Sequence, residues 1–413
     1  MMASSLLSIT QAPTFSEYVA THSKNYVPGS DEWVHHEKIY WKEAAAIVSH
    51  NLSYIQGRMY YTKGINQFTD MTKEEHTAYT MGYRKDHHSM WQPGGDALKD
   101  QDPAVFVKNV NLRTPAAISD KEVERILEDT HAEPPFEMDE VSDLPDAVDW
   151  RNDVYGVVTA VKDQGHCGSC WAFAATATLE SHIAIQTSTL FNFSPQELVS
   201  CMPNSQICGG NGGCAGATVD LAFNYLMSTG GILQEYEIGY SSYFGDHGTC
   251  PLNESDKKYR RVANISGLSK LQTNSYKALM NAVAKAGPVA VSVACSPWIS
   301  YKSGIYHPDP DSDPTDADYD INHAVVLVGY GTDEDLGMDY WIIRNSWSPM
   351  WGEHGYVRIL REDPAVVGED QACGMDSTPL DGSGCEGGPE QVTVCGTSGI
   401  LFDSVIPVGG YLL

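Results

Sequence analysis

Residues 164–173 read QGHCGSCWAF, and they decide how the rest of the chain is interpreted. A glycine-rich turn leads into an apolar run from Trp171 to Glu180 that contains no proline or glycine and repeats apolar residues at helical spacing. Cys170 therefore stands at the predicted N-terminus of a helix. Unpaired backbone N–H groups and the positive end of the helix dipole favour a thiolate there, and we expect a thiol pKa below the usual value of about 8.5.

A nucleophilic thiol needs a base and a group that orients the base, and the chain supplies both further on. His323 opens an apolar, β-branched strand that ends in a Gly-Tyr-Gly turn at residues 329–331. Asn345 ends a second predicted strand, within YWIIRNSW at residues 340–347. We expect Cys170 to be the nucleophile, His323 the acid and base, and Asn345 the residue that orients His323.

These blocks resemble the papain/cathepsin L family of cysteine proteases, in which Cys, His and Asn follow in this order. The likeness extends to LPDAVDWR at residues 144–151, which is similar to a mature N-terminus of that family, and to WGEHGY at residues 351–356. It covers roughly residues 144–379 for the enzyme and part of 14–75 for a prodomain. The resemblance implies a cysteine endopeptidase made as a zymogen, which hydrolyses peptide bonds through a thioester on Cys170.

The resemblance implies an α+β, papain-like fold, in which a helical prodomain precedes a helical lobe and a β-barrel-like lobe. The sequence agrees, because helical patterns occupy residues 170–187, 194–199 and 218–227, and strand patterns follow at 289–294, 324–328, 340–344 and 355–359. Cys170 and His323 would then come from different lobes and face each other across a cleft, where ligand sites often form.

Four segments are expected along the chain. Residues 1–83 form a helical inhibitory prodomain, because 14–60 hold two amphipathic patterns separated at residues 28–30, and 64–70 match a family prodomain motif, Gly-x-Asn-x-Phe-x-Asp. Residues 84–143 are polar and rich in proline and acidic residues, which is typical of an accessible linker. Residues 144–379 form the peptidase. Residues 380–413 form a cysteine-containing C-terminal extension, expected to pack on the surface of the second lobe.

Further site residues follow from the resemblance. Gln164 is expected to donate a side-chain N–H to the oxyanion of the tetrahedral intermediate, beside the backbone N–H of Cys170. Gly212 and Gly213 resemble the glycines that let a substrate strand approach the enzyme backbone closely. Trp347 is expected to border the substrate and to cover the catalytic histidine from water.

The ten cysteines indicate disulfide bonds. The resemblance implies two bridges in the helical lobe, Cys201–Cys250 and Cys167–Cys208, and Cys385–Cys395 is a candidate bridge in the tail. Nine non-catalytic cysteines cannot all pair within one chain. At least one of the three others is therefore expected to be free: Cys214, Cys295 and Cys373.

The expected surroundings of the protein follow from charge and composition. A formal net charge of −28 argues against nucleic acid as a partner, and no run of about 18 apolar residues could span a membrane. Cysteines and the sequons at Asn51, Asn192, Asn253 and Asn264 indicate a lysosomal, vacuolar or secreted glycoprotein. Residues 1–10 do not resemble a signal peptide, so we expect a truncated or misassigned start.

Partners and cofactors are predicted from the same features. Protein or peptide substrates and the chain's own prodomain are the expected partners of a monomeric enzyme. No cofactor and no metal are implied, because the Cys167–Cys170 pair lacks the second ligand pair of a structural zinc site. Two other functions share the same residues: a catalytically silent binding protein, and a transacylase or ligase that passes the acyl group to an amine.

Overall fold

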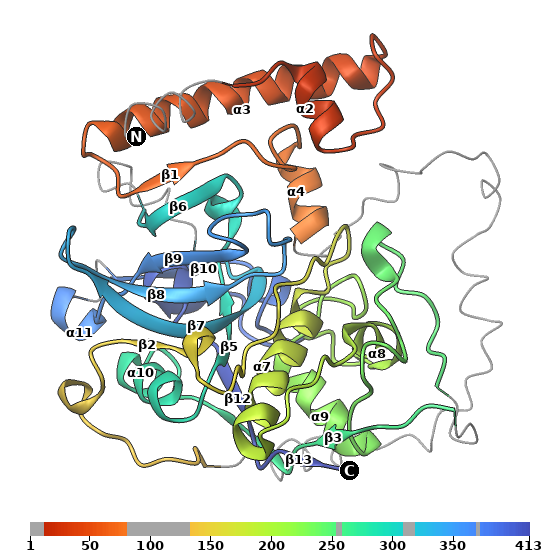
Figure 1. The fold of residues 1–413 in the computed structure, drawn as a ribbon, viewed down its shortest axis with the longest axis vertical. Helices are drawn as coiled ribbons and strands as arrows, with labels where there is room; N and C mark the ends of the chain where they lie inside the picture. The colour runs from red at the N-terminus through yellow and green to blue at the C-terminus, as the bar shows by residue number, and fades with distance from the viewer. Residues whose placement is uncertain (1–11, 81–132, 253–257, 309–318, 369–371) are drawn as a thin grey trace.

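A computed structural model describes residues 12–80, 133–252, 258–308, 319–368 and 372–413. Figure 1 shows the N-terminal helices lying across one end of the molecule, above a mixed sheet that packs beside a group of helices. Most of the predicted linker lies outside the described residues, which include only its last part, from 133 to 143. The described portion of the chain contains no helix long and apolar enough to cross a membrane.

The predicted prodomain contains the two expected helices. Helix α2 (Phe15–Thr21) begins with a capping box between Thr14 and Glu17. Helix α3 (Asp31–Ile55) begins after Ser30, whose side chain accepts a hydrogen bond from the backbone of the first turn. The buried face of α3 packs against α2, and a short helix, α4 (Lys73–Thr80), follows.

The N-terminal segment docks on the sheet. Strand β1 (Tyr61–Lys63) pairs antiparallel with β6 (Tyr301–Tyr306) and so covers an edge of the main sheet. Asn66 donates a side-chain hydrogen bond of 2.7 Å to the carbonyl of Ile299. The Phe68 ring packs edge-on against Trp347, with 5.6 Å between ring centroids.

The main sheet has the strand order β1-β6-β9-β8-β7-β5-β12-β4, and β2 (Val148–Asp149) pairs with β7 outside this path. Its further strands are β4 (Gly267–Lys270), β5 (Val289–Val293), β7 (His323–Asp333), β8 (Met338–Arg344), β9 (Tyr356–Leu360) and β12 (Ser404–Val408). Helix α10 (Tyr276–Lys285) packs against this sheet. Smaller elements are the pair β3 (Ala263–Asn264) and β13 (Tyr411–Leu412), the pair β10 (Cys373–Asp376) and β11 (Val392–Cys395), and α11 (Pro364–Val367).

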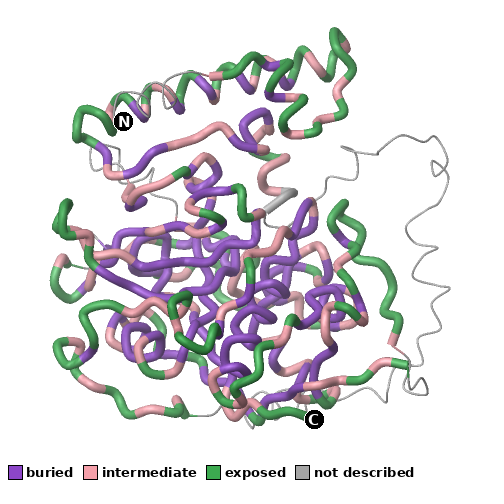
Figure 2. The backbone as a smooth tube through the Cα atoms, viewed as in Figure 1, coloured by how far each residue is buried: buried purple, intermediate pink, exposed green. Residues whose placement is uncertain are grey.

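The helical lobe is built around α7 (Cys170–Thr187), whose bounds match the predicted helix. Every residue of α7 from Cys170 to Ala184 is buried, since the helix carries apolar residues on several faces and is covered by the sheet and by other helices. Figure 2 shows this buried helix beside the buried sheet. Helices α8 (Pro195–Cys201) and α9 (Val219–Thr229) complete the lobe.

The C-terminal residues are not a surface extension. Strand β12 lies between β5 and β4 within the main sheet. Ile400, Leu401 and Ile406 are buried in the core of the sheet lobe. The sheet lobe therefore continues beyond residue 379, because β12 lies between two other strands of its sheet.

Two of the expected disulfides are wrong and one is present. The structure contains the Cys201–Cys250 bridge. Cys167 pairs with Cys214 because Gly168 pairs with Ala215 and donates its N–H to the Cys214 carbonyl at 3.0 Å. The remaining bridges are Cys208–Cys385 and Cys373–Cys395, the latter set by the register of β10 and β11. Cys295 and Cys170 form no disulfide, so the expectation that one of the three remaining cysteines stays unbridged is confirmed.

The asparagines of the sequons differ in how far they are buried. Asn51 is buried in α3, and its side chain exchanges two hydrogen bonds of 2.9 Å with the backbone of Lys63. Asn264 is buried in β3. Asn192 is exposed, whereas Asn253 lies outside the described residues. Among the described sequons, Asn192 is therefore the one that a glycan fits without disturbing the fold.

Asp70 anchors the N-terminal segment, and its removal should loosen that segment. The buried carboxylate accepts hydrogen bonds of 2.8 Å from the Tyr18 hydroxyl and from the Lys24 ammonium. Asp70→Asn should destabilise the segment by on the order of 3 kcal/mol, because the mostly buried Lys24 charge loses its counter-ion. Urea unfolding of the inactive Cys170→Ala chain measures this. Exposed Glu74→Gln is the control, and equal losses for both variants would contradict the assignment.

Candidate active site

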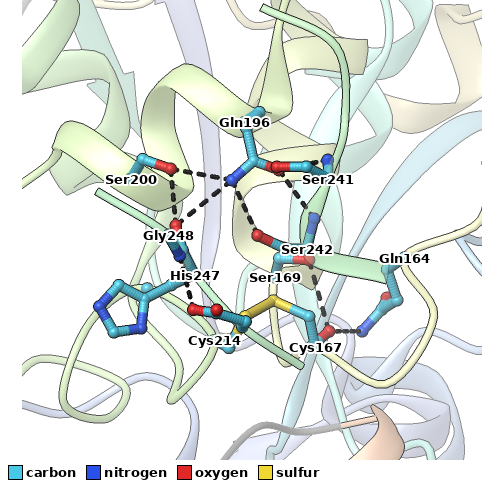
Figure 3. The surroundings of a disulfide bond; sticks show 12 residues. Gln164, Cys167, Ser169, Gln196, Ser200, Cys214, Ser241, Ser242, His247 and Gly248 are labelled. Carbon is cyan, nitrogen blue, oxygen red and sulfur yellow. Dashed lines mark hydrogen bonds between the residues drawn. A yellow bond between two sulfur atoms is a disulfide. The ribbon is translucent and has the colours of Figure 1, made fainter. Parts of the chain in front are cut away.

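A tight turn delivers Cys170 to the cleft. Gly165 has φ +60°, and a Cβ there would lie 2.3 Å from the Tyr243 carbonyl oxygen, so the turn requires glycine. The Cys167–Cys214 disulfide fixes the middle of the turn to the neighbouring loop (Figure 3). Helix α7 then begins at Cys170, as predicted, and the side chain is buried.

The sheet lobe supplies the predicted imidazole and amide. His323 is the first residue of β7, and Asn345 directly follows β8, the antiparallel neighbour of β7. The Nε2 atom of His323 lies 2.8 Å from the Oδ1 atom of Asn345. Trp347 stacks on the His323 ring with 4.8 Å between centroids, and all three side chains are buried. The hydrogen bond therefore lies in a place from which water is excluded.

Cys170 and His323 line one pocket between the two lobes. The helical lobe contributes Gly209 and residues 216–219 to this pocket. The sheet lobe contributes Ser292 and residues 322–324. The thiol and the imidazole, which are far apart in the sequence, thus meet at the expected cleft.

The thiol pKa differs from the sequence-based expectation. Burial raises the pKa of Cys170 to about 11, although backbone N–H groups of Ala324, Trp171 and Cys170 itself oppose the shift. Burial disfavours the charged thiolate, and in this conformation it outweighs the favourable helix N-terminus. In this conformation the raised pKa therefore favours the protonated thiol at neutral pH.

Gln164 is held from both lobes. Its side-chain amide donates a hydrogen bond of 3.0 Å to the Cys167 carbonyl, as Figure 3 shows. Its side-chain oxygen accepts a hydrogen bond of 2.6 Å from the hydroxyl of Ser346. Ser346 was not singled out in the sequence, although it stands next to Asn345. Its contact fixes the orientation of the Gln164 amide, so that N–H groups and not the oxygen face the turn.

Gly212 and Gly213 do not line the pocket. A Cβ at Gly212 would lie 3.2 Å from the Asn204 side chain, and one at Gly213 would lie 3.1 Å from the His247 side chain. Gly209 and Gly216 stand at the pocket instead. The wrong choice of glycines and the wrong partner for Cys167 have one cause. Cys167 is bridged to Cys214, and this bridge places Gly216, the first glycine after Cys214, at the cleft. The position of Cys214 two residues before Gly216 is the sequence signal that identifies this glycine.

No metal site accompanies this pocket. Across the described ranges, no group of three or more His, Cys, Asp or Glu residues is arranged to hold a metal ion.

The protonated thiol predicts slow alkylation of the intact chain. Iodoacetamide should label Cys170 slowly near pH 7 and faster only as the pH rises toward 11, because the thiolate is the reactive form. Peptide mapping of the label across this pH range measures the rate, with buried Cys295 as the internal control. Equally fast labelling of the intact chain at pH 7 would contradict the shift.

Comparison with known proteins places the chain in a family. A family model described as papain family cysteine protease matches residues 144–382, and one described as cathepsin propeptide inhibitor domain (I29) matches residues 15–76. Cathepsin L of Sarcophaga peregrina is 32% identical over 360 residues, covering 87% of this chain and 88% of the relative. Procathepsin L of Rattus norvegicus is 32% identical over 353 residues, covering 84% of this chain and 86% of the relative.

A solved structure extends the likeness to both parts of the chain. Digestive procathepsin L 3 of Tenebrio molitor larval midgut superimposes with a TM-score of 0.61 at 28% identity, covering 95% of this chain and 97% of that one. The two family models match in the order in which the inhibitory and catalytic parts were expected. The chain therefore belongs to the papain family of cysteine proteases and is a cysteine endopeptidase made as a zymogen behind a cathepsin-type inhibitory prodomain.

Proposed function

We propose that Cys170, His323, Asn345 and Gln164 carry out peptide-bond hydrolysis in this enzyme. The observation that supports this most strongly is the shared pocket of the buried Cys170 thiol and the His323 ring, whose Nε2 atom Asn345 holds at 2.8 Å. Because Nε2 donates to the Asn345 oxygen, Nδ1 is the nitrogen that exchanges the proton with the thiol.

The first half of the reaction forms a thioester. His323 takes the thiol proton, and the Cys170 sulfur attacks the substrate carbonyl carbon. The oxygen becomes an oxyanion that accepts hydrogen bonds from the Gln164 side chain and the Cys170 backbone N–H. The C–N bond then breaks, and the leaving amine takes the proton from the His323 imidazolium.

The second half releases the acyl group. His323 takes a proton from water, and the resulting hydroxide attacks the thioester carbonyl through the same oxyanion site. The C–S bond breaks, the acid product leaves, and the proton returns to the Cys170 sulfur. Burial of the Asn345–His323 hydrogen bond under Trp347 keeps the ring in one orientation through both halves.

The enzyme acts as a monomer on protein or peptide substrates. It is located in the lysosome or vacuole, or is secreted from the cell. The four disulfides support this location, since such bonds persist in secretory proteins and are rare in the cytosol. The formal charge of −28 supports the absence of nucleic acid among its partners.

Loss of either member of the thiol–imidazole pair should abolish turnover. We expect a similar decrease in kcat for a peptide substrate in Cys170→Ala, in His323→Ala and in the double variant, because each single change already disables the pair. Cys295→Ala is the matched control and should keep its activity. Residual turnover in Cys170→Ala, or additive losses in the double variant, would refute the proposed roles.

Gln164 and Ser346 should affect the rate and not substrate binding. Gln164→Ala should lower kcat about 10²–10³-fold with little change in KM, because the oxyanion forms only in the transition state. Ser346→Ala should lower kcat less, since it frees the Gln164 amide to rotate without removing its N–H groups. Steady-state kinetics separate these effects, and losses confined to KM would count against an oxyanion role.

His76 should contribute to acid release of the prodomain. Its Nε2 atom lies 2.8 Å from the Phe68 carbonyl oxygen in the docked segment, and burial lowers its pKa below 6.5, although Glu43, Glu75 and Asp70 oppose the shift. The docked form therefore resists protonation. Its stability is intact above about pH 6.5 and falls as the pH drops through the lower docked-state pKa.

The measurement is limited proteolysis of the prodomain in the inactive Cys170→Ala chain between pH 7 and pH 4. His76→Gln should flatten the increase in cleavage with acid, because glutamine does not titrate. Exposed His35→Gln serves as the control and should leave the profile unchanged. An unchanged profile for His76→Gln would exclude this contribution.

A further inference from the structure

The pocket beside Cys170 is lined by a third segment in addition to the residues of the helical lobe and the sheet lobe named above. Asp381 and Gly382 also line it, and they belong to the turn that follows β10. We call residues 379–388 the strap. The strap lies between β10 and β11, outside the main sheet, and all of it except Pro379 falls within the C-terminal extension expected from the sequence.

One side of the strap is fixed to the sheet lobe, close to the catalytic histidine. Gly382 packs so tightly on Ile321 that a Cβ there would lie 2.1 Å from the Ile321 carbonyl oxygen. Just before the strap, the Ser377 backbone N–H donates a hydrogen bond of 2.7 Å to the Asp320 carboxylate. The strap thus starts directly over the residues that precede His323.

The other side of the strap is fixed to the helical lobe. The Gly209 N–H donates a hydrogen bond of 2.8 Å to the Gly384 carbonyl, and the Glu386 N–H donates one of 3.1 Å to the Gln206 carbonyl. Between these two bonds, the Cys208–Cys385 disulfide joins the strap covalently to the same loop. A Cβ at Gly209 would lie 2.7 Å from the Gly382 carbonyl oxygen, so no space separates strap and loop.

The strap therefore runs from one wall of the cleft to the other. Its position relative to the reaction follows from the proposed function. The leaving amine takes its proton from His323, so the leaving side of the substrate extends toward the stack of His323 and Trp347. Besides Cys170 and His323 themselves, the pocket under the strap is lined by Gly209 and residues 216–219, whereas neither Trp347 nor Gln164 lines it. It therefore receives the acyl side.

We propose that the strap narrows the acyl end of the cleft, so that this endopeptidase cleaves bonds preceded by a short amino-side stretch of substrate more efficiently than bonds preceded by a long one. This rests on the proposed function, because it assumes that Cys170 carries the acyl group. The Cys208–Cys385 bridge keeps the end narrow by preventing the strap from lifting off the helical lobe. The enzyme still accepts long chains on the leaving side.

The test uses the full chain after acid activation, with the Cys208–Cys385 bridge verified by mass spectrometry. One peptide series lengthens the amino side of a fixed scissile bond from one to eight residues, and a second series lengthens the carboxyl side. The value of kcat/KM should fall about tenfold or more once the amino side passes the strap. It should not fall in the second series. Equal rates for all amino-side lengths would overturn the proposal.

Opening the strap should remove the length limit. The double variant Cys208→Ser, Cys385→Ser should cleave the long amino-side peptides at a rate closer to that of the short ones. The matched control is Cys201→Ser, Cys250→Ser, which removes a disulfide of the helical lobe that does not join the strap and should keep the limit.

The outcomes separate the two proposals. A limit that persists with the bridge removed, or that disappears in the control variant, would overturn the role of the bridge. Failure of the wild-type enzyme to cleave any peptide of either series would refute the proposed function and, with it, the strap. Normal cleavage of short and long amino-side peptides alike refutes the strap alone.

Discussion

Burial of Cys170 at the junction of the two lobes is the constraint on which the rest of the site depends. The helix that carries it is buried along its whole length from Cys170 to Ala184, so the helical lobe and the sheet lobe both close around it. Burial raises the thiol pKa to about 11, and a thiol so protonated is a poor nucleophile by itself. In the proposed mechanism, the imidazole that Asn345 holds on the other lobe is therefore essential to the chemistry.

The same junction explains how the prodomain controls the enzyme. Strand β1 adds to the edge of the main sheet, and Phe68 packs on Trp347, the residue that covers the catalytic histidine. The side chain of Gln67 also donates a hydrogen bond of 3.2 Å to the Trp347 carbonyl. Docking of the prodomain thus covers the leaving-group side of the site. The strap covers the other end, and it is part of the catalytic domain, so it would persist after activation.

Local patterns predicted the parts of the structure that local forces determine. The bounds of α7 followed from the helical pattern at residues 170–187, and α8 lies where the pattern at residues 194–199 predicted a helix. Features set by packing between distant segments were predicted poorly. The partner of Cys167 depends on the pairing of Gly168 with Ala215, and the raised thiol pKa depends on desolvation by both lobes. Neither can be read from spacing along the chain.

The central claim is that the Cys170 sulfur carries the acyl group between two proton transfers by His323. A slowly hydrolysed ester substrate, mixed with the activated enzyme and quenched in acid, should leave the acyl mass on the peptide that contains Cys170. The adduct should be absent from His323→Ala, because the buried thiol then has no base to deprotonate it. An adduct on Cys295 or on a serine, or turnover without any acyl-enzyme adduct under these conditions, would contradict the claim.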